Sequence, residues 1–294
     1  MPKQIKYIGV DVGGTKILLQ TFDDKLNQIE ETKIKTNTKS HAHFMKSIYD
    51  LIDFFFKKSV KGIGIAVPGI VDINKGVLVH APHLPSKRNT PIGQLLKKRY
   101  GVKVHVDNDI NAFLAAEHAR PHLKKFKNIV AVMVGTGVGG AVFVNDNLMY
   151  GKNGFAGEVG HMIIDKCSPL KTFEENTSGH YVPKIAKLIN PNLKSKITAP
   201  MLEEMLKAKS MSAKKIQNHL VNSLATGLSN LNLVFNPEVI VLGGSIYHKY
   251  LSSKKKEIER IIKKNSLDKT SPKLIDAKST TSVCKGTVLL LNAE

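Results

Sequence analysis

Two glycine-rich bends in the sequence have the composition of loops that hold phosphate groups. The first, Gly13-Gly14-Thr15-Lys16, follows Asp11, and the second is Gly135-Thr136-Gly137. Because glycine has no Cβ atom, backbone N–H groups in such bends can face phosphate oxygens, and each Thr adds a hydroxyl. An acidic residue beside them, here Asp11, can hold Mg²⁺ directly or through water, as phosphoryl transfer requires. A hairpin that binds nothing is the alternative for either bend taken alone.

The elements around these bends occur twice in the same order. Strands are predicted at Tyr7–Val10, Ile17–Phe22 and Thr32–Lys35, and then from Asn128 to Val134, on to Val144 and near Leu148. Two copies of strand, bend and strand, each followed by helices and further strands, predict a duplicated α/β fold with a cleft between its domains.

Hydrophobic periodicity extends this pattern along the chain. Residues 45–55 and 92–99 are predicted as helices, and residues 62–67 and 102–106 as strands. A long helix behind Ser212, its predicted N-cap, ends at Asn236-Pro237, and a strand at 239–242 and the turn Gly243-Gly244 follow. We expect a small α/β domain at residues 1–108 and a larger one at 109–281, with a C-terminal helix at about 282–294 packing back on the first.

The composition limits the partners that the protein can take. Its 294 residues fit about two domains, and a hydrophobic content of 42% gives each one a core. The net charge of +20 suggests a polyanionic partner, but only four of the 44 basic residues are Arg, the residue that phosphate readers favour. We prefer to interpret the scattered Lys residues as a solvated exterior, and we expect no specific nucleic-acid partner.

The cysteines and the apolar segments predict a cytoplasmic protein. Cys167 and Cys284 are too few for a disulfide framework or a Cys-rich zinc site, which suits a reducing compartment. The N-terminus runs straight into a strand pattern without the apolar core of a signal peptide. The longest uncharged run, Ile129–Val144, is shorter than a membrane span and contains four glycines. We therefore expect neither export nor a membrane partner.

Five motifs occur together across nearly the whole chain: Asp11-Val-Gly-Gly-Thr-Lys16, Asn108-Asp109-Ile-Asn111, Gly135-Thr-Gly-Val-Gly-Gly140, Glu158-Val-Gly-His161 and Asn236-Pro-Glu-Val-Ile-Val-Leu-Gly-Gly244. In this order and spacing they resemble the ROK family of bacterial sugar kinases, repressors and open reading frames, in the superfamily of actin and hexokinase. The resemblance implies an α/β fold of duplicated ribonuclease-H-like (actin/hexokinase-type) domains flanking an active-site cleft. It also implies a phosphotransferase with an alcohol group as acceptor, in a family that commonly forms homodimers.

The resemblance implies roles for the residues of both bends and of the late turn. ATP contacts are implied for Gly13, Gly14, Thr15, Lys16, Gly135, Thr136, Gly137, Gly243 and Gly244. Asp109 becomes the catalytic base, since a sugar hydroxyl is a poor nucleophile until its proton has an acceptor. The structural alternative for Asp109 is an ordinary N-cap of the helix that begins at Ile110. Mg²⁺ is expected near Asp11, held through the phosphates or water.

The resemblance also implies a set of sugar-binding residues. These are Asn108, Glu158, His161 and a later Glu, for which Glu174 is the match in the aligned segment and Glu175 the alternative. Without the family, Glu158 and His161 would be interpreted as a surface turn with a satisfied histidine.

The sequence departs from the family pattern in the segment between His161 and Glu174, which we call the sugar loop. Many members place three cysteines after the His, and their thiolates with the His hold a structural zinc. Only Cys167 lies between His161 and Glu174 here, so we expect no zinc site. His83 stands where the family usually has a sugar-contacting Asn, so we expect His83 to contact the sugar there, and its different donor and acceptor pair leaves the identity of the sugar open. Family repressors add a helix-turn-helix domain before the first bend; with ten residues before Asp11, we expect no such domain here.

These observations predict an ATP-dependent sugar kinase that uses Mg²⁺ and phosphorylates a hexose, with glucose to glucose 6-phosphate as the best single guess. Fructose, mannose, N-acetylmannosamine and N-acetylglucosamine remain alternative substrates. Inorganic polyphosphate remains an alternative donor, because a Lys-rich surface would favour a long polyanion. A non-catalytic sugar-binding member of the family is the contrasting class.

Overall fold

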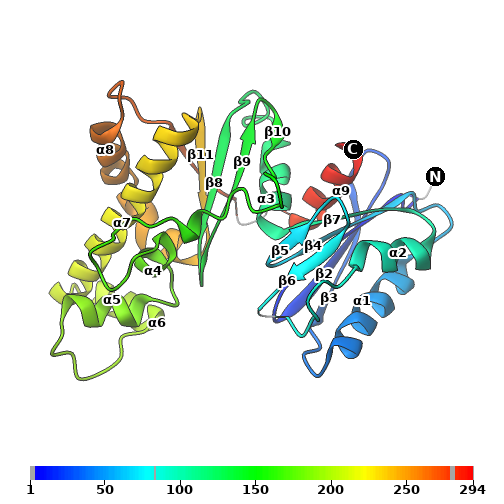
Figure 1. Cartoon of the computed structure of the whole chain (residues 1–294), viewed down its shortest axis with the longest axis horizontal. Coiled ribbons are helices and arrows are strands. Elements are labelled where there is room, and N and C mark those ends of the chain that lie inside the picture. Colours follow the sequence, from blue (N-terminus) through cyan, green and yellow to red (C-terminus); the bar gives the residue numbers. More distant parts are fainter. Residues whose placement is uncertain (1–3, 83, 279–281, 294) are drawn as a thin grey trace. The chain divides into compact units, whose positions relative to one another are not determined.

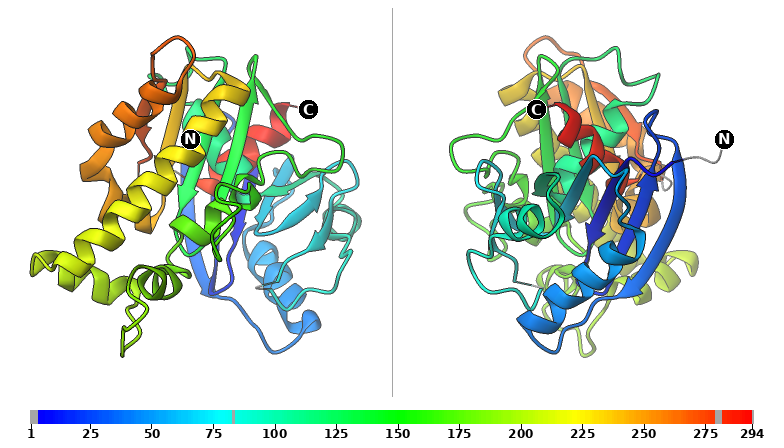
Figure 2. Two further views of the ribbon diagram at one scale, coloured as in Figure 1. Left: turned by 60° about the vertical axis from the view of Figure 1, so that its left-hand side comes forward. Right: turned by 90° about the vertical axis from the view of Figure 1, so that its right-hand side faces the viewer.

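A computed structural model describes residues 4–82, 84–278 and 282–293. The chain divides into two compact units: unit 1 is Met1–Lys125, Tyr150–Ala156 and Thr280–Glu294, and unit 2 is Phe126–Met149 and Gly157–Ser279. Each unit contains a five-stranded sheet with helices (Figures 1 and 2). The division differs from the predicted domain boundary at residue 109, because helix α3 (Asp109–His118) packs along the C-terminal helix α9 (Val283–Ala293).

The sheet of unit 1 begins with the hairpin that carries the first glycine bend. Its strand order is β3 (Gln28–Lys35), β2 (Lys16–Phe22), β1 (Tyr7–Val12), β4 (Gly62–Val67) and β7 (Lys103–Asn108). β1, β2 and β3 are antiparallel, whereas β1, β4 and β7 are parallel. Register pairs Asp11 with Ala66 and Ala66 with Asp107. The carboxyl ends of β1 and β7 therefore lie on one edge, about 10 Å apart at the usual strand spacing.

Helices cover both faces of this sheet, because successive strand residues point to opposite sides. α1 (His41–Phe55) packs on the face that presents Ile8 and Ile63. On the other face, Gly9 lets α9 come close, since a Cβ atom there would collide with the carbonyl oxygen of Cys284. Unit 1 is completed by α2 (Ile92–Tyr100) and the hairpin of β5 (Ile70–Asp72) and β6 (Val77–His80).

Unit 2 repeats the antiparallel hairpin and adds a larger helical part. Its strand order is β10 (Asn147–Leu148), β9 (Val138–Val144), β8 (Ile129–Val134), β11 (Val239–Gly243) and β12 (Lys273–Asp276). Its helices are α4 (Phe173–Thr177), α5 (Val182–Ile189), α6 (Ala199–Lys207), α7 (Met211–Phe235) and α8 (Lys255–Asn265), with short helical turns η1 (Val159–His161), η2 (Tyr247–Leu251) and η3 (Ser252–Lys254). Among the described residues, no helix has the length and apolar character needed to cross a membrane.

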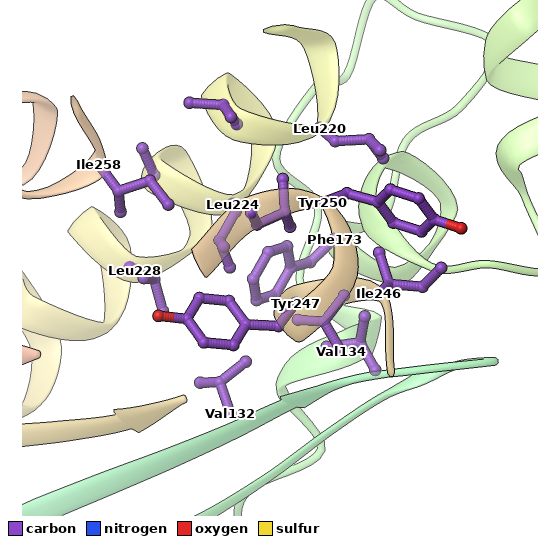
Figure 3. Packing of buried hydrophobic residues seen from close by; sticks show 14 of the residues in the cluster. Val132, Val134, Phe173, Leu220, Leu224, Leu228, Ile246, Tyr247, Tyr250 and Ile258 are labelled. Carbon is purple, nitrogen blue, oxygen red and sulfur yellow. The ribbon is translucent and has the colours of Figure 1, made fainter. Parts of the chain in front are cut away.

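The core of unit 2 is built between its sheet and α7, which lies alongside the green strands (Figure 2). Val132 and Val134 of β8 point toward the leucines of α7, and Phe173 lies between them (Figure 3). Gly227 of α7 makes room for this ring, because a Cβ atom there would lie 2.5 Å from it. Burial of Phe173 thus fixes α4, the helix that carries Glu174.

The long helix begins two residues earlier than the sequence predicts. Ser210, not Ser212, is the N-cap of α7, and its hydroxyl accepts a hydrogen bond from the N–H of Ala213. An N-cap residue must precede the first helical residue, which is Met211. Ser212 lies inside the first turn and therefore cannot be the cap. The predicted end is correct, since Asn236 adopts a left-handed conformation (φ 42°) and closes the helix before Pro237.

Candidate active site

The first glycine bend joins β1 to β2 and is fixed by the residue that follows β3. Gly13 donates its N–H to the carbonyl of Lys16 (2.8 Å). Thr36 donates its hydroxyl to the carbonyl of Gly13 (2.6 Å) and its N–H to the carbonyl of Thr15 (3.0 Å). Thr15 and Lys16 are exposed. The bend is therefore a held loop that presents a hydroxyl and an ammonium group, the donors that suit a phosphate.

Asp11, at the end of β1, is a carboxylate that lacks full solvation. Its side chain is half-buried, and burial raises its pKa to about 6, although the charge of Lys16 opposes the rise. A neighbouring cation stabilises the ionised form of a partly buried carboxylate. Asp11 therefore fits the expected role of holding Mg²⁺ directly or through water.

The β7–α3 corner presents Asn108 and Asp109. Asn108 is the N-cap of α3, because its Oδ1 accepts from the N–H of Ile110 (2.8 Å) and its Nδ2 donates to the carbonyl of Gly69 (2.8 Å). Asp109 is the first helical residue, and its Oδ1 also lies 3.0 Å from the N–H of Ile110. The capping position considered for Asp109 thus belongs to Asn108. Asp109 is half-buried at the positive end of α3, where a carboxylate is favoured.

A buried network behind this corner was not identified in the sequence. Asp107 has no exposed surface, and its Oδ1 accepts from the N–H of Asn108 (2.7 Å) and from Nδ2 of Asn111 (2.9 Å). Its Oδ2 lies 3.0 Å from Nε2 of His105 and accepts from the hydroxyl of Tyr150 (2.8 Å). The sequence signal for part of it is two polar residues on the same face of a strand. The contribution of Tyr150 has no such signal.

The second glycine bend lies in unit 2 between β8 and β9, beside the late Gly-Gly turn. Gly135 donates its N–H to the carbonyl of Gly137 (2.9 Å). Gly244 adopts a φ of 93° and leaves no space for a Cβ atom against the carbonyl of Val134. These contacts bring two segments with predicted ATP contacts together.

The two neighbouring glutamates after the sugar loop, Glu174 and Glu175, make different contacts. Oε2 of Glu174 accepts from the N–H of Val138 (2.8 Å), directly after the second bend. Oε2 of Glu175 instead accepts from the N–H groups of Lys171 (2.8 Å) and Thr172 (2.9 Å) and completes a capping box. Glu174 therefore faces the second bend, and Glu175 holds the start of its own helix.

Glu158 and His161 lie at the ends of one short turn, η1. Oε2 of Glu158 is 3.9 Å from Nε2 of His161, and the two side chains are 42% and 80% exposed. Partial burial raises the pKa of Glu158, His161 lowers it, and the charge of Glu174 raises it further. Glu158 is thus close enough to both His161 and Glu174 to interact with them electrostatically. Two exposed polar groups here can exchange hydrogen bonds with hydroxyls.

Comparison with known proteins identifies the family. The sequence model of the ROK family matches residues 7–290. The chain belongs to the ROK family. It is 28% identical over 270 residues to a glucokinase of Thermotoga maritima, covering 84% of this chain and 83% of the relative. It is also 28% identical over 256 residues to an N-acetyl-D-glucosamine kinase of Haemophilus influenzae, covering 82% of this chain and 84% of the relative.

The fold agrees with this membership. The structure of a ROK family glucokinase from Streptomyces griseus, in complex with glucose and AMPPNP, superposes with a TM-score of 0.78 at 20% identity, covering 99% of this chain and all of the other. The predicted α/β fold of the actin and hexokinase type is confirmed.

The loop after His161 in this ROK protein is closed by its own backbone. Ile164 donates its N–H to the carbonyl of Lys171 (2.9 Å), and buried Asn176 donates Nδ2 to the carbonyl of Leu170 (2.9 Å). Within the described ranges, no group of three or more His, Cys, Asp or Glu residues could hold a metal ion. His83, the other predicted departure from the family, lies outside the described residues.

Proposed function

We propose that this ROK protein is an ATP-dependent sugar kinase that transfers the γ-phosphoryl group to a hexose hydroxyl, with glucose to glucose 6-phosphate as the leading candidate. The observation that carries the proposal is the position of Asp109. It begins α3 beside Asn108, on the same edge of the unit 1 sheet as Asp11 and the first glycine bend. A carboxylate in this place can accept the proton of a hydroxyl that attacks a phosphate held near that edge.

Asp109 acts as the general base in this proposal. It accepts the proton of the sugar hydroxyl as the oxygen attacks phosphorus, so that the nucleophile gains electron density when it is needed. Asn108 holds the start of α3 and offers its amide to the sugar. The positive end of the helix favours a negatively charged side chain at Asp109.

The two glycine bends and the late turn bind the donor. Backbone N–H groups of the bends, with Thr15, Lys16 and Thr136, supply donors for the phosphate oxygens, and the turn at Gly244 lies on the nucleoside side. A Mg²⁺ ion bound with the nucleotide would neutralise negative charge on the transferring group. Asp11 fits this ion because its carboxylate is half-buried and its pKa is raised.

Asn108, Glu158, His161 and Glu174 recognise the sugar in this proposal. Carboxylates accept from sugar hydroxyls, while imidazole and amide groups can also donate, so the set can distinguish hydroxyl positions.

Two alternatives have specific support. N-acetylglucosamine is a second candidate substrate, since the kinase of Haemophilus influenzae is as similar in sequence as the glucokinase of Thermotoga maritima. A non-catalytic sugar-binding protein is the other alternative, because the family includes repressors. The presence of Asp109 with both bends favours the enzyme.

A sugar panel tests the proposal. ADP release with MgATP is measured for glucose, fructose, mannose, N-acetylmannosamine and N-acetylglucosamine, with calorimetry of sugar binding in parallel. We expect the highest kcat/KM with glucose. A higher value with another sugar would change the substrate but not the reaction. Sugar binding without sugar-dependent ADP release would indicate that the protein is a non-catalytic sugar-binding protein and not a kinase.

A further inference from the structure

The carboxylate of Glu174 lies directly against the end of the second glycine bend. Its Oε2 accepts from the N–H of Val138 at 2.8 Å, and a Cβ atom added at Gly137 would lie only 2.6 Å from that oxygen. The absence of a side chain at Gly137 therefore lets the carboxylate reach the backbone. A residue with a predicted sugar contact is bonded to a segment with predicted phosphate contacts.

The helix that carries Glu174 is held firmly enough to transmit this contact. The ring of Phe173 is fully buried beside Leu224 and Leu228 of α7 (Figure 3). A Cβ atom added at Gly227 of the same helix would lie 2.5 Å from this ring. Asn176 is also buried and donates Nδ2 to the carbonyls of Leu170 and Thr172, both at 2.9 Å. The position of Glu174 is thus set by packing on both sides of it rather than by its own exposed bonds.

The segment after α4 is bonded to the same bend. Gly179 donates its N–H to the carbonyl of Gly135 (2.8 Å), and His180 donates its N–H to the carbonyl of Thr136 (3.1 Å). Residues 174–180 therefore satisfy carbonyls at the start of the bend through the backbone and an N–H at its end through the carboxylate of Glu174. The backbone bonds persist whatever side chain is at position 174, so only the last contact depends on it.

We propose that Glu174 is a positioning residue for the phosphate donor as well as a sugar-binding residue, and that it couples the two binding events. The proposal rests on the kinase function above. Oε2 keeps the N–H of Val138 turned toward α4 and so fixes the shape of the Gly135–Gly137 bend. A carboxylate has a second acceptor oxygen, and Oε1 can take a sugar hydroxyl at the same time. Sugar bound there restricts the carboxylate and, through it, the bend that receives the nucleotide.

Nucleotide binding without sugar tests the positioning role. The affinity for AMPPNP with Mg²⁺ is measured by calorimetry for wild type, Glu174→Ala, Glu174→Gln and Glu175→Ala. We expect Glu174→Ala to weaken binding about tenfold, as loss of a charge-assisted hydrogen bond predicts. Glu174→Gln retains an acceptor oxygen and should stay within about twofold. Glu175→Ala removes the same charge and a helix cap from the same helix, and should also stay within about twofold.

A double-mutant cycle gives a second measurement that is independent of any loss of stability. Gly137→Ala should displace the carboxylate in wild type, whereas the Glu174→Ala background leaves space for the new methyl group. We expect Gly137→Ala to weaken AMPPNP binding at least threefold more in the presence of Glu174 than in its absence.

The outcomes separate this inference from the proposed function. Equal AMPPNP affinity of wild type and Glu174→Ala, or equal losses in Glu174→Ala and Glu175→Ala, would overturn the positioning role and leave the kinase proposal intact. A wild-type protein that does not bind AMPPNP would overturn the kinase proposal and this role with it.

Discussion

The hydroxyl of Tyr150 donates to Oδ2 of Asp107 over 2.8 Å, although the two residues are 43 positions apart. Asp107 is fully buried, and its other oxygen accepts from the N–H of Asn108 and from Asn111. The carboxylate thus spans the corner from which the proposed base projects. Tyr150 holds one side of that carboxylate, and the other side holds Asn108 and Asn111, the residues on either side of the Asp109-Ile110 pair.

Tyr150→Phe is expected to lower kcat three- to tenfold while both KM values stay within about twofold. The variant removes one of the two partners of Oδ2 of Asp107 and leaves His105 as the other. Loss of this hydrogen bond also lowers the free energy of unfolding by about 1 kcal/mol. Steady-state kinetics and denaturant unfolding measure the two effects. Tyr100→Phe is the matched control, because the hydroxyl of Tyr100 donates to Asp53 instead. Equal kcat for the two variants would show that Tyr150 does not orient the base.

Asp109→Asn is expected to abolish turnover and preserve sugar binding. The amide keeps nearly the same shape and hydrogen-bonding reach but cannot take the hydroxyl proton. General-base catalysis typically contributes on the order of 10² to 10⁴ to the rate. Initial rates and calorimetry of sugar binding should therefore separate. More than about a tenth of the wild-type rate would mean that the base is another residue.

Local patterns predicted much of the fold. The hairpins around both bends, the strand at residues 62–67 and the end of α7 at Asn236 depend on apolar runs, glycine turns and a helix stop that neighbouring residues encode. The short helices α4 to α6 were not resolved individually, because five to nine residues carry little periodicity.

The contacts that organise the candidate site could not be predicted in the same way. Glu174 reaches Val138 across 36 positions, and no spacing along the chain indicates which of two neighbouring Glu residues turns toward the bend. The choice is made by the capping box, which uses Glu175, and by the burial of Phe173. Side-chain networks of this kind depend on how elements pack, which residue patterns describe only in part.

The pKa of Asp11 predicts a pH dependence of nucleotide use. Asp11 titrates near pH 6 in the free protein because it is buried, and only its ionised form attracts a cation. At saturating sugar, kcat/KM for MgATP should therefore rise as pH increases through about 6, since this ratio reports groups of the form that has not yet bound the nucleotide. Asp11→Asn should have a lower kcat/KM for MgATP, and this ratio should not rise with pH. The same pH profile in both proteins would assign the ionisation elsewhere.

The same shift predicts a stability difference of known sign. The folded pKa of about 6 exceeds the ordinary value of 3.8, so the folded state binds more protons than the unfolded state between these values. Stability from this group is therefore lost as pH rises from about 4 to 6. Asp11→Asn should be more stable than wild type at pH 8, by about 3 kcal/mol, and the difference should nearly vanish at pH 4. Denaturant unfolding at both pH values measures it, and a less stable variant at pH 8 would contradict the prediction.

The last prediction concerns the donor, because a net charge of +20 gives a reason to consider inorganic polyphosphate. A long polyanion would gain affinity from many Lys residues by counterion release, and its use would fall steeply with salt. A nucleotide held by two bends and the turn at Gly244 needs no broad basic surface. We therefore expect ATP to be preferred, with rates that change only modestly from low to moderate ionic strength. Competition between the two donors at matched phosphate concentration measures this. A preference for polyphosphate that collapses with salt would overturn the ATP assignment and give the excess charge a function.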